Sequence, residues 1–233
     1  MQTRVLVPEV MDDPELDRRA HFHALRGLQR INRLTGAGRL AWGPIRRLAR
    51  ELGRDRLSIL DVATGAGDVP IDLCRRAARE GVRLDVEACD FSDKAREFAA
   101  ENFRRAQLEI PLFSLDVLED SIERPYDVVM CSTFLHHFTE EQVVVILRSM
   151  LAAATHRVLV IDLVRGRMNW WQVWLASHVL TRSKVVHFDG PQSIRAAFTV
   201  AEMRALAERA GMCDLQIRGV WPCRLVMVGR RGE

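Results

Sequence analysis

The feature that most constrains the fold is a short apolar segment that ends in a glycine turn. Residues 57–63 (LSILDVA) are long enough for one buried strand, and the turn Thr64-Gly65-Ala66-Gly67 follows directly. An apolar run without polar alternation is typical of a parallel sheet that is covered on both faces. Residues 68–80 then predict a helix, so the glycines lie in a strand-to-helix turn. In open sheets, ligands bind at such turns.

The alternation of strand and helix continues along the chain. Further apolar runs predict strands over residues 84–89, 111–115, 126–132 and 157–163. Helical patterns cover residues 92–107, 139–154 and 199–210. The last two strands, 213–220 and 223–229, are joined across Trp221-Pro222 as a hairpin. This order predicts an α/β fold, a Rossmann-like doubly wound sheet of seven strands whose last strand is antiparallel.

The residues before the first strand form an N-terminal helical addition. Helical patterns over residues 14–33 and 40–52 are separated by the stop signal Thr35-Gly36-Ala37-Gly38. Residues 1–13 have no clear period and predict a loose tail. We expect a single domain over residues 1–233, with a helical cap over 1–54 and a core over 55–230. Inside the core, residues 164–198 predict an irregular lid with one helix over 169–180.

Composition excludes several classes of protein. Hydrophobic residues make up 48% of the 233 and charged residues 28%, which allows a sizeable core. The net charge of +3 is too small to indicate a nucleic-acid surface. No segment resembles a signal peptide or a membrane-spanning helix, and the five cysteines form no CxxC pair. We therefore expect a cytoplasmic protein with reduced thiols, no transmembrane segment and no metal site.

The glycine turn and its surroundings resemble a known family. The segment LDVATGAGDVP at residues 60–70 is similar to motif I of class I S-adenosylmethionine-dependent methyltransferases, in which an acid and three further residues precede GxG. The resemblance extends over roughly residues 55–230. It implies a methyltransferase with S-adenosyl-L-methionine as cofactor and S-adenosyl-L-homocysteine as product. An NAD-dependent oxidoreductase is disfavoured because Pro70 stands where the dinucleotide fingerprint needs a small residue.

The resemblance also implies a cofactor site at the ends of successive strands. Asp61 would support the glycine loop or bind the amino group, Asp90 would hold the ribose hydroxyls, and Asp116 would receive the adenine amino group. The expected cofactor contacts are Asp61, Ala63, Gly65, Ala66, Gly67, Asp90, Phe91, Asp116, Val117, Cys131 and Ser132. One such acid alone is more often a helix cap or a turn residue. Three acids on one edge favour the ligand interpretation.

Two histidines follow the fourth strand at the mouth of the expected cleft. Methyl transfer from a sulfonium depends mainly on positioning, and a hydroxyl acceptor also benefits from a base that removes its proton. Histidine has a suitable pKa for this task. In the small-molecule methyltransferases that the chain resembles, this loop often carries such a histidine, and an acid after the fifth strand assists it. The resemblance therefore implies His136 or His137 as the base, with His136 favoured and Asp162 as its partner. The alternative is that one histidine caps the following helix or contacts the cofactor.

The segment after the fifth strand is rich in aromatic residues. Trp170, Trp171 and Trp174 lie within NWWQVWLASHVL at residues 169–180. Such a stripe is usually core, but insertions at this place cover the acceptor site in the family that the chain resembles. We expect the three tryptophans to line an acceptor pocket, with His187 and Arg195 as weaker contacts. Contact with a membrane surface is the alternative, because basic residues flank the stripe.

Two segments, RSKVVHFDGPQSIRAAFT and WPCRLVMVGRR, resemble small methyltransferases encoded beside type III polyketide synthases. This resemblance implies secondary metabolism and a small phenolic or quinone-like acceptor that is O-methylated by direct displacement. C-methylation of an activated ring is the alternative reaction, and a non-catalytic cofactor-binding protein is the alternative of another class. We expect no nucleic-acid partner, peripheral membrane contact at most, and a monomer or homodimer.

Overall fold

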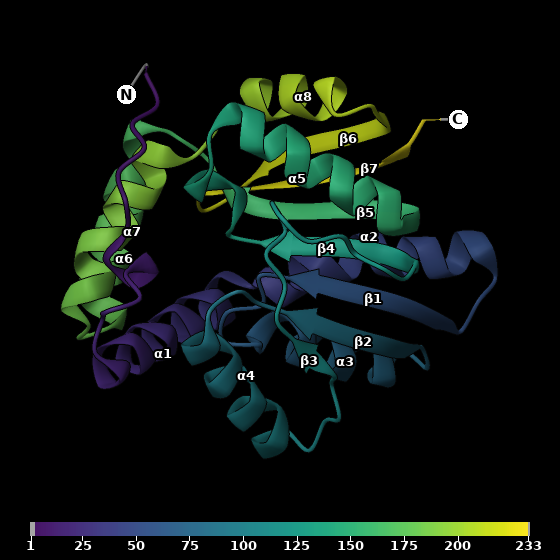
Figure 1. Ribbon diagram of the computed structural model, residues 1–233, viewed down its shortest axis with the longest axis horizontal. Helices are drawn as coiled ribbons and strands as arrows, with labels where there is room; N and C mark the ends of the chain where they lie inside the picture. The colour runs from purple at the N-terminus through teal and green to yellow at the C-terminus, as the bar shows by residue number, and fades with distance from the viewer. Residues whose placement is uncertain (1–2, 233) are drawn as a thin grey trace.

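A computed structural model describes residues 3–232 and shows one sheet flanked by helices (Figure 1). The strands are β1 (Arg56–Val62), β2 (Arg83–Cys89), β3 (Leu112–Phe113), β4 (Tyr126–Ser132), β5 (Ala154–Leu163), β6 (Met212–Val220) and β7 (Arg224–Arg231). They form a seven-stranded sheet in the order β3-β2-β1-β4-β5-β7-β6, and β7 is antiparallel to both of its neighbours. The predicted Rossmann-like doubly wound sheet of seven strands with an antiparallel last strand is confirmed.

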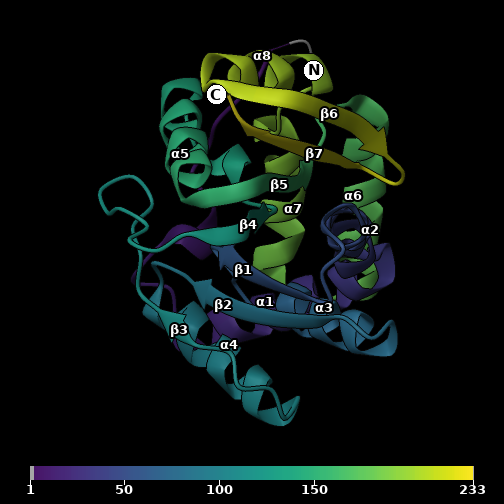
Figure 2. The ribbon, with the colours of Figure 1, turned by 90° about the vertical axis from the view of Figure 1, so that its right-hand side faces the viewer.

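Helices cover both faces of this sheet. The helical elements are η1 (Val10–Asp12), α1 (Arg18–Thr35), α2 (Ala37–Leu52), α3 (Asp68–Arg79), α4 (Asp93–Arg105), η2 (Leu135–His137), α5 (Glu140–Ala153), α6 (Arg167–Leu180), α7 (Lys184–Ala196) and α8 (Val200–Arg209). Figure 2 shows α5 and α8 on one side of the sheet, and α2 and α3 on the other. The central strands are therefore buried on both faces, which explains their continuous apolar sequence.

The alternation of side chains along the strands divides the core into two layers. Val129 and Cys131 of β4 pack in the layer of α5 and α8, whereas Val128 and Met130 pack in the layer of α2 and α3. Polar caps start the helices that cover these layers. The Thr199 hydroxyl accepts a hydrogen bond from the Glu202 amide, and the Glu202 side chain accepts one from the Thr199 amide. These reciprocal bonds form a capping box at the start of α8.

Three elements differ from the prediction. The third strand is shorter than expected and keeps only Leu112–Phe113. The stop signal after α1 is shorter, because Gly36 alone makes the turn with a left-handed φ of 73° and α2 begins at the next residue. The lid contains a second helix, α7, although Gly190-Pro191 disfavours one in sequence. Packing between α7 and both α6 and α1 outweighs this local preference.

The predicted loose tail is wrong, because residues 3–13 are bound to the rest of the molecule. We call them the N-terminal segment. The Val5 amide donates a hydrogen bond to the Arg195 carbonyl (3.1 Å), and the Val10 amide donates to the Asp189 carboxylate (2.9 Å). Arg4 donates to the carbonyl of His136 (2.8 Å). These partners lie far away in the sequence, so no local pattern in residues 3–13 indicates the contact.

The N-terminal segment, α1, α6 and α7 lie together, and we call this group the cap. It differs from the predicted helical cap over residues 1–54, because it leaves out α2 and includes both helices of the lid. Figure 1 shows them beside the ends of the parallel strands. Phe22 and Leu25 of α1 pack against Ala66 in the glycine turn, so the predicted helical addition covers the site directly. Among residues 3–232, no helix has the length and apolar character needed to cross a membrane.

Candidate active site

The site lies where the strand order changes direction. From β1 the chain adds β2 and β3 on one side, and then returns to place β4 and β5 on the other. The crevice between the carboxyl ends of β1 and β4 is the place where doubly wound sheets bind ligands. Asp61 lies near the end of β1, and Cys131 and Ser132 end β4. Three of the predicted cofactor residues therefore lie at this crevice.

The glycine turn has the geometry of a ligand loop. Gly65 and Gly67 both have left-handed φ values, 55° and 70°. A Cβ atom on Gly67 would lie 2.5 Å from the Phe103 ring, so glycine is needed there for packing. A Cβ atom on Gly65 would have no neighbour within 4 Å. The backbone at Gly65 is thus open on one side, which allows close approach of a ligand.

Buried polar atoms without a partner mark the same crevice. Asp61 is buried, and one of its carboxylate oxygens accepts a hydrogen bond from the Thr64 hydroxyl (2.7 Å). The other oxygen, Oδ1, and the Ser132 Oγ have no hydrogen-bond partner among the described residues. Burying polar atoms without partners is costly, so such atoms usually have a function. The donor set fits a polar cofactor that supplies the missing hydrogen bonds.

Electrostatics make Asp61 unusual. Burial raises the pKa of Asp61 to about 7, and the neighbouring Asp68 and Asp90 add to the effect, while the Thr64 hydroxyl opposes it. Burial also raises the pKa of Asp90. Two carboxyl groups that resist ionisation at one crevice favour a positively charged ligand group, because a nearby cation would stabilise both carboxylates.

Asp90 is placed by backbone contacts at the end of β2. Its carboxylate accepts hydrogen bonds from the Gly65 amide (2.8 Å) and the Ser92 amide (2.9 Å). Each oxygen can accept a further bond, so the residue is available to a diol. Phe91 beside it is 71% exposed, so its ring is accessible for stacking against a ligand.

Asp116 and Val117, which the resemblance assigns to the adenine end of the cofactor, have contacts within the protein instead. Asp116 closes a turn, because its carboxylate accepts from the Leu118 amide (3.0 Å). Val117 packs into the core layer of α5 and α8. The turn interpretation that sequence reasoning left open therefore accounts for Asp116 without a ligand. Ala63, by contrast, has a left-handed φ of 55° at the end of β1, a strained conformation that commonly occurs at functional sites.

His136 and Asp162 form a buried pair. The Nδ1 atom of His136 lies 2.7 Å from Asp162 Oδ1, and the His136 amide donates to the other carboxylate oxygen (3.2 Å). Asp162 is near the end of β5 and His136 is in η2, which directly follows β4. The structure therefore brings together the two residues that the sequence pairs. The carboxylate orients the imidazole and leaves Nε2 for other contacts.

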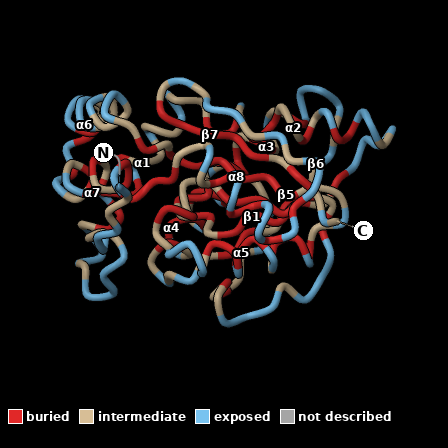
Figure 3. Tube along the Cα trace, turned by 90° about the horizontal axis from the view of Figure 1, so that it is seen from above, coloured by how far each residue is buried: buried red, intermediate tan, exposed pale blue. Residues whose placement is uncertain are grey.

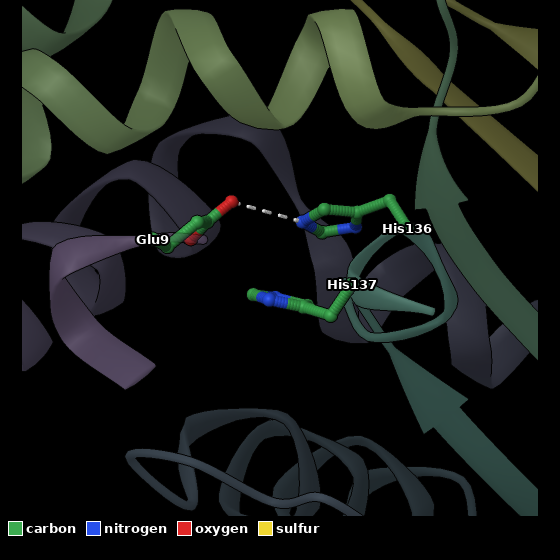
Figure 4. Close-up of side chains that lie close together, drawn as sticks. All are labelled: Glu9, His136 and His137. Carbon is green, nitrogen blue, oxygen red and sulfur yellow. Dashed lines mark ion pairs between the residues drawn. The ribbon is translucent and has the colours of Figure 1, made fainter. Parts of the chain in front are cut away.

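Sequence reasoning missed the third member of this cluster, Glu9. A Glu9 carboxylate oxygen lies 3.6 Å from His136 Nε2 (Figure 4), whereas Asp162 contacts Nδ1. Glu9 also accepts a hydrogen bond from the Ser193 hydroxyl. Burial favours neutral His136, but Asp162 and Glu9 outweigh burial and raise the pKa of His136 to about 10. His136 is therefore a buried imidazolium between two carboxylates.

His137 lies against His136 and outside the buried pair. The two ring centroids are 4.3 Å apart, and His137 Nδ1 lies 2.9 Å from an Asp12 carboxylate oxygen. Glu9, His136 and His137 each offer one potential metal-ligand atom, all within 4.8 Å of one another. Because Glu9 and His136 already form an ion pair, we interpret this group as an acid–base cluster.

Arg224 is a second residue that sequence reasoning missed. It is buried at the start of β7, and its guanidinium donates to Thr133 Oγ1 (3.0 Å) and Asn32 Oδ1 (2.7 Å). It thereby links α1 to the loop that follows β4. Burial lowers the pKa of Arg224, and burial raises the pKa of the nearby Asp68 to about 6. An arginine in an apolar strand gives no sequence signal that distinguishes it from an exposed one.

The lid residues do not all face the site. Trp170 is half-buried and packs with Leu163 and Ile194, but Trp171 is 59% exposed and Trp174 is exposed as well. His187 donates from Nε2 to the Thr181 carbonyl (3.0 Å) and stacks on His178, while the Arg195 side chain is exposed. Trp170 is thus the best packed of the three, and the expectation that all three tryptophans line one pocket stays a prediction.

Comparisons with known proteins agree with this geometry. A family model described as "Methyltransferase domain" matches residues 59–157. The release factor glutamine methyltransferase of Lactococcus lactis subsp. lactis is 38% identical over 77 residues, which is 33% of this chain and 27% of that protein.

Solved structures share the fold. Human N-acetylserotonin methyltransferase in complex with SAM superimposes with a TM-score of 0.65 at 16% identity, over 92% of this chain and 56% of that one. The mitomycin 7-O-methyltransferase MmcR gives a TM-score of 0.55 at 23% identity, over 74% of this chain and 48% of that one. The chain thus spans about half the length of these structures. Residues 59–157 thus match the methyltransferase domain family, and the described chain shares the fold of these methyltransferase structures.

Proposed function

We propose that this chain is an S-adenosylmethionine-dependent methyltransferase that methylates an oxygen of a small aromatic acceptor, with His136 as general base. The observation that carries the proposal is the buried His136–Asp162 pair (2.7 Å). It lies at the same strand edge as Asp61, whose free carboxylate oxygen is unpartnered. An acid–base pair beside a ligand loop is the arrangement that proton removal during methyl transfer requires.

Three groups would hold the cofactor. Asp61 and the open backbone at Gly65 would bind the methionine part, and Asp90 would accept hydrogen bonds from the ribose hydroxyls. When bound, the sulfonium supplies a methyl group that is already activated for displacement. The chain's own residues then have to position the acceptor oxygen and take its proton.

Nε2 of His136 is the atom that would take the proton. Asp162 holds Nδ1 and favours the imidazolium that forms as the proton arrives. In the described conformation Glu9 lies 3.6 Å from Nε2, where the acceptor oxygen has to be. The acceptor would therefore displace Glu9, and loss of this carboxylate would lower the pKa of His136 toward the range in which it acts as a base.

The names of the structural relatives support a small aromatic acceptor. They include methyltransferases for N-acetylserotonin and for mitomycin at a 7-oxygen. A phenol or quinol suits His136 because its hydroxyl is acidic enough to be deprotonated by imidazole. The alternatives are C-methylation of an activated ring and cofactor binding without catalysis. The link to polyketide synthases stays a prediction.

One experiment with two parts tests the proposal. Titration calorimetry is expected to show binding of S-adenosylmethionine and S-adenosylhomocysteine and no binding of NAD. A panel of phenols and quinols with methyl-labelled cofactor is then expected to yield labelled ethers. Cofactor binding without transfer to any acceptor would favour the non-catalytic alternative, and label on ring carbon would favour C-methylation. Absence of cofactor binding would contradict the proposal as a whole.

A further inference from the structure

Helix α6 exposes an apolar face that none of the described elements covers. Met168, Trp171, Leu175 and Val179 recur every three or four residues and are all exposed, with Val179 70% exposed. Only Ser177 of this helix is buried. Figure 3 shows α6 drawn largely in the colour of exposed residues. Because a surface helix normally turns its apolar stripe inward, a stripe turned outward indicates an interaction surface.

The surroundings of this α6 face are basic. Residues 163–188 contain four Arg or Lys residues and no Asp or Glu. Arg165 is paired with Glu202 in the interior, while Arg167, Arg182 and Lys184 are exposed at the two ends of the stripe. The charge of this region is thus positive at both ends of the helix, although the whole chain carries only +3.

A hollow at the end of α6 adds to the positive charge. Arg30 of α1 donates to the Leu180 carbonyl (2.6 Å) and lies beside the exposed Val179. The hollow is lined by His23, Arg30, Val179, Leu180, Thr181 and Arg182. Two guanidinium groups next to an exposed apolar side chain provide contacts for a ligand with an anionic head and an apolar body.

We propose that the α6 face docks on an anionic lipid surface. Tryptophan suits the boundary between headgroups and acyl chains because its ring is apolar and its N–H is polar. The basic residues at both ends of α6 complement acidic headgroups. A second copy of the chain is a poorer occupant, because a two-fold interface would bring this basic, acid-free face against itself.

The face lies outside the acid–base cluster, so the proposal does not depend on methyl transfer. Helix α6 starts at Arg167, shortly after Asp162 in β5, and Trp170 packs against Leu163 at the end of that strand. Docking through Trp171 and Leu175 would therefore hold the cap side of the molecule against the lipid. A lipophilic acceptor would then have a short path from the bilayer to the site.

Cosedimentation of the full chain with vesicles tests the proposal. Vesicles of phosphatidylcholine mixed with phosphatidylglycerol are expected to bind the chain at least about 10-fold better than phosphatidylcholine alone at low salt. Added salt is expected to weaken this binding. Leu175→Glu is expected to reduce it about 10-fold or more, because it removes an apolar contact and adds a negative charge. Val145→Glu, at an exposed apolar position on α5, is the matched control and is expected to bind as the unmodified chain does.

The contrary outcomes are equally defined. Failure to bind either kind of vesicle at low salt would overturn the proposal. Equal binding to neutral and anionic vesicles would overturn the role of the basic ends. Sedimentation velocity without lipid is the remaining arm. A dimer that Leu175→Glu abolishes and Val145→Glu leaves intact would assign the α6 face to a second copy instead.

Discussion

The strand edge and the cap that faces it are built by different means. At the edge, Asp61, Ser132 and Asp162 lie within strands, so the register of the sheet fixes their positions. In the cap, Glu9 reaches the site from the N-terminal segment through side-chain contacts with distant residues. Solved structures only 16% to 23% identical share the fold that makes the edge. On the proposed function, the edge carries the chemistry and the cap controls access to it.

The largest effect is expected from replacing His136, the proposed general base at the strand edge. His136→Asn keeps an amide that can donate to Asp162 but removes the atom that would take the proton. We expect kcat to fall by about 10²- to 10⁴-fold with unchanged cofactor affinity. His137→Asn is the matched control, expected to lose much less, because His137 lies outside the buried pair. Steady-state kinetics and calorimetry measure both quantities. Full turnover in both variants would show that neither histidine is an essential base.

A smaller effect tests whether the edge also binds the cofactor. Asp90→Ala removes a carboxylate that would accept hydrogen bonds from the ribose, and we expect cofactor affinity to fall about 10- to 100-fold. Asp93→Ala removes a largely exposed acid in the first turn of α4, whose carboxylate pairs with Arg96, and is the control. Calorimetric titration with S-adenosylhomocysteine compares the two. Unchanged affinity in Asp90→Ala would remove the ribose assignment.

The smallest effect is expected from replacing Glu9 in the cap, and it concerns the pH dependence of turnover. Below a pH of about 10 His136 is charged in the free protein, so the active neutral form becomes populated as pH rises. Glu9→Gln removes one of the two carboxylates that raise this pKa, so the rising limb of kcat/KM against pH should move to lower pH. The kcat profile should move less, because the acceptor has already displaced Glu9 in the complex.

The exposed Glu15 provides the control for this cap variant. Glu15→Gln is expected to leave both pH profiles in place, since its side chain is outside the cluster. Superimposable kcat/KM profiles for Glu9→Gln and the unmodified chain would mean that Glu9 does not set the protonation of His136. An equal shift of the kcat profile along the pH axis would mean that Glu9 stays in place when the acceptor binds.

Most of the edge could be predicted from sequence, for a physical reason. A buried parallel strand needs a continuous apolar run, and a ligand turn needs glycine, so residues 57–67 carry both signals within one segment. The pairing of His136 with Asp162 was implied by the resemblance to small-molecule methyltransferases, which places a histidine after the fourth strand and an acid near the end of the fifth. The cap gave no such signals. Glu9 looks like any acid in a polar stretch, because its partners His136 and Ser193 are far along the chain.

The lid shows the limit of periodicity as well. One helix is expected in the lid, yet α7 forms as well and continues through Gly190-Pro191, because tertiary packing outweighs local preference. The sequence shows that α6 carries an aromatic stripe, but it does not show whether the stripe faces the protein interior or the solvent. An apolar helix is consistent with a buried pocket wall or an exposed docking face, and only the position of its neighbours decides between them.

The path of the N-terminal segment has a consequence for how the protein is made. Arg4 binds a carbonyl 132 residues later, and the Val10 amide binds a carboxylate 179 residues later. The N-terminal segment therefore cannot dock until η2 and α7 have been synthesised and folded. Contacts of such long range close slowly, because the entropy of the intervening loop must be lost first. The contacts that surround His136 are thus completed only late in folding, after the sheet that supports them exists.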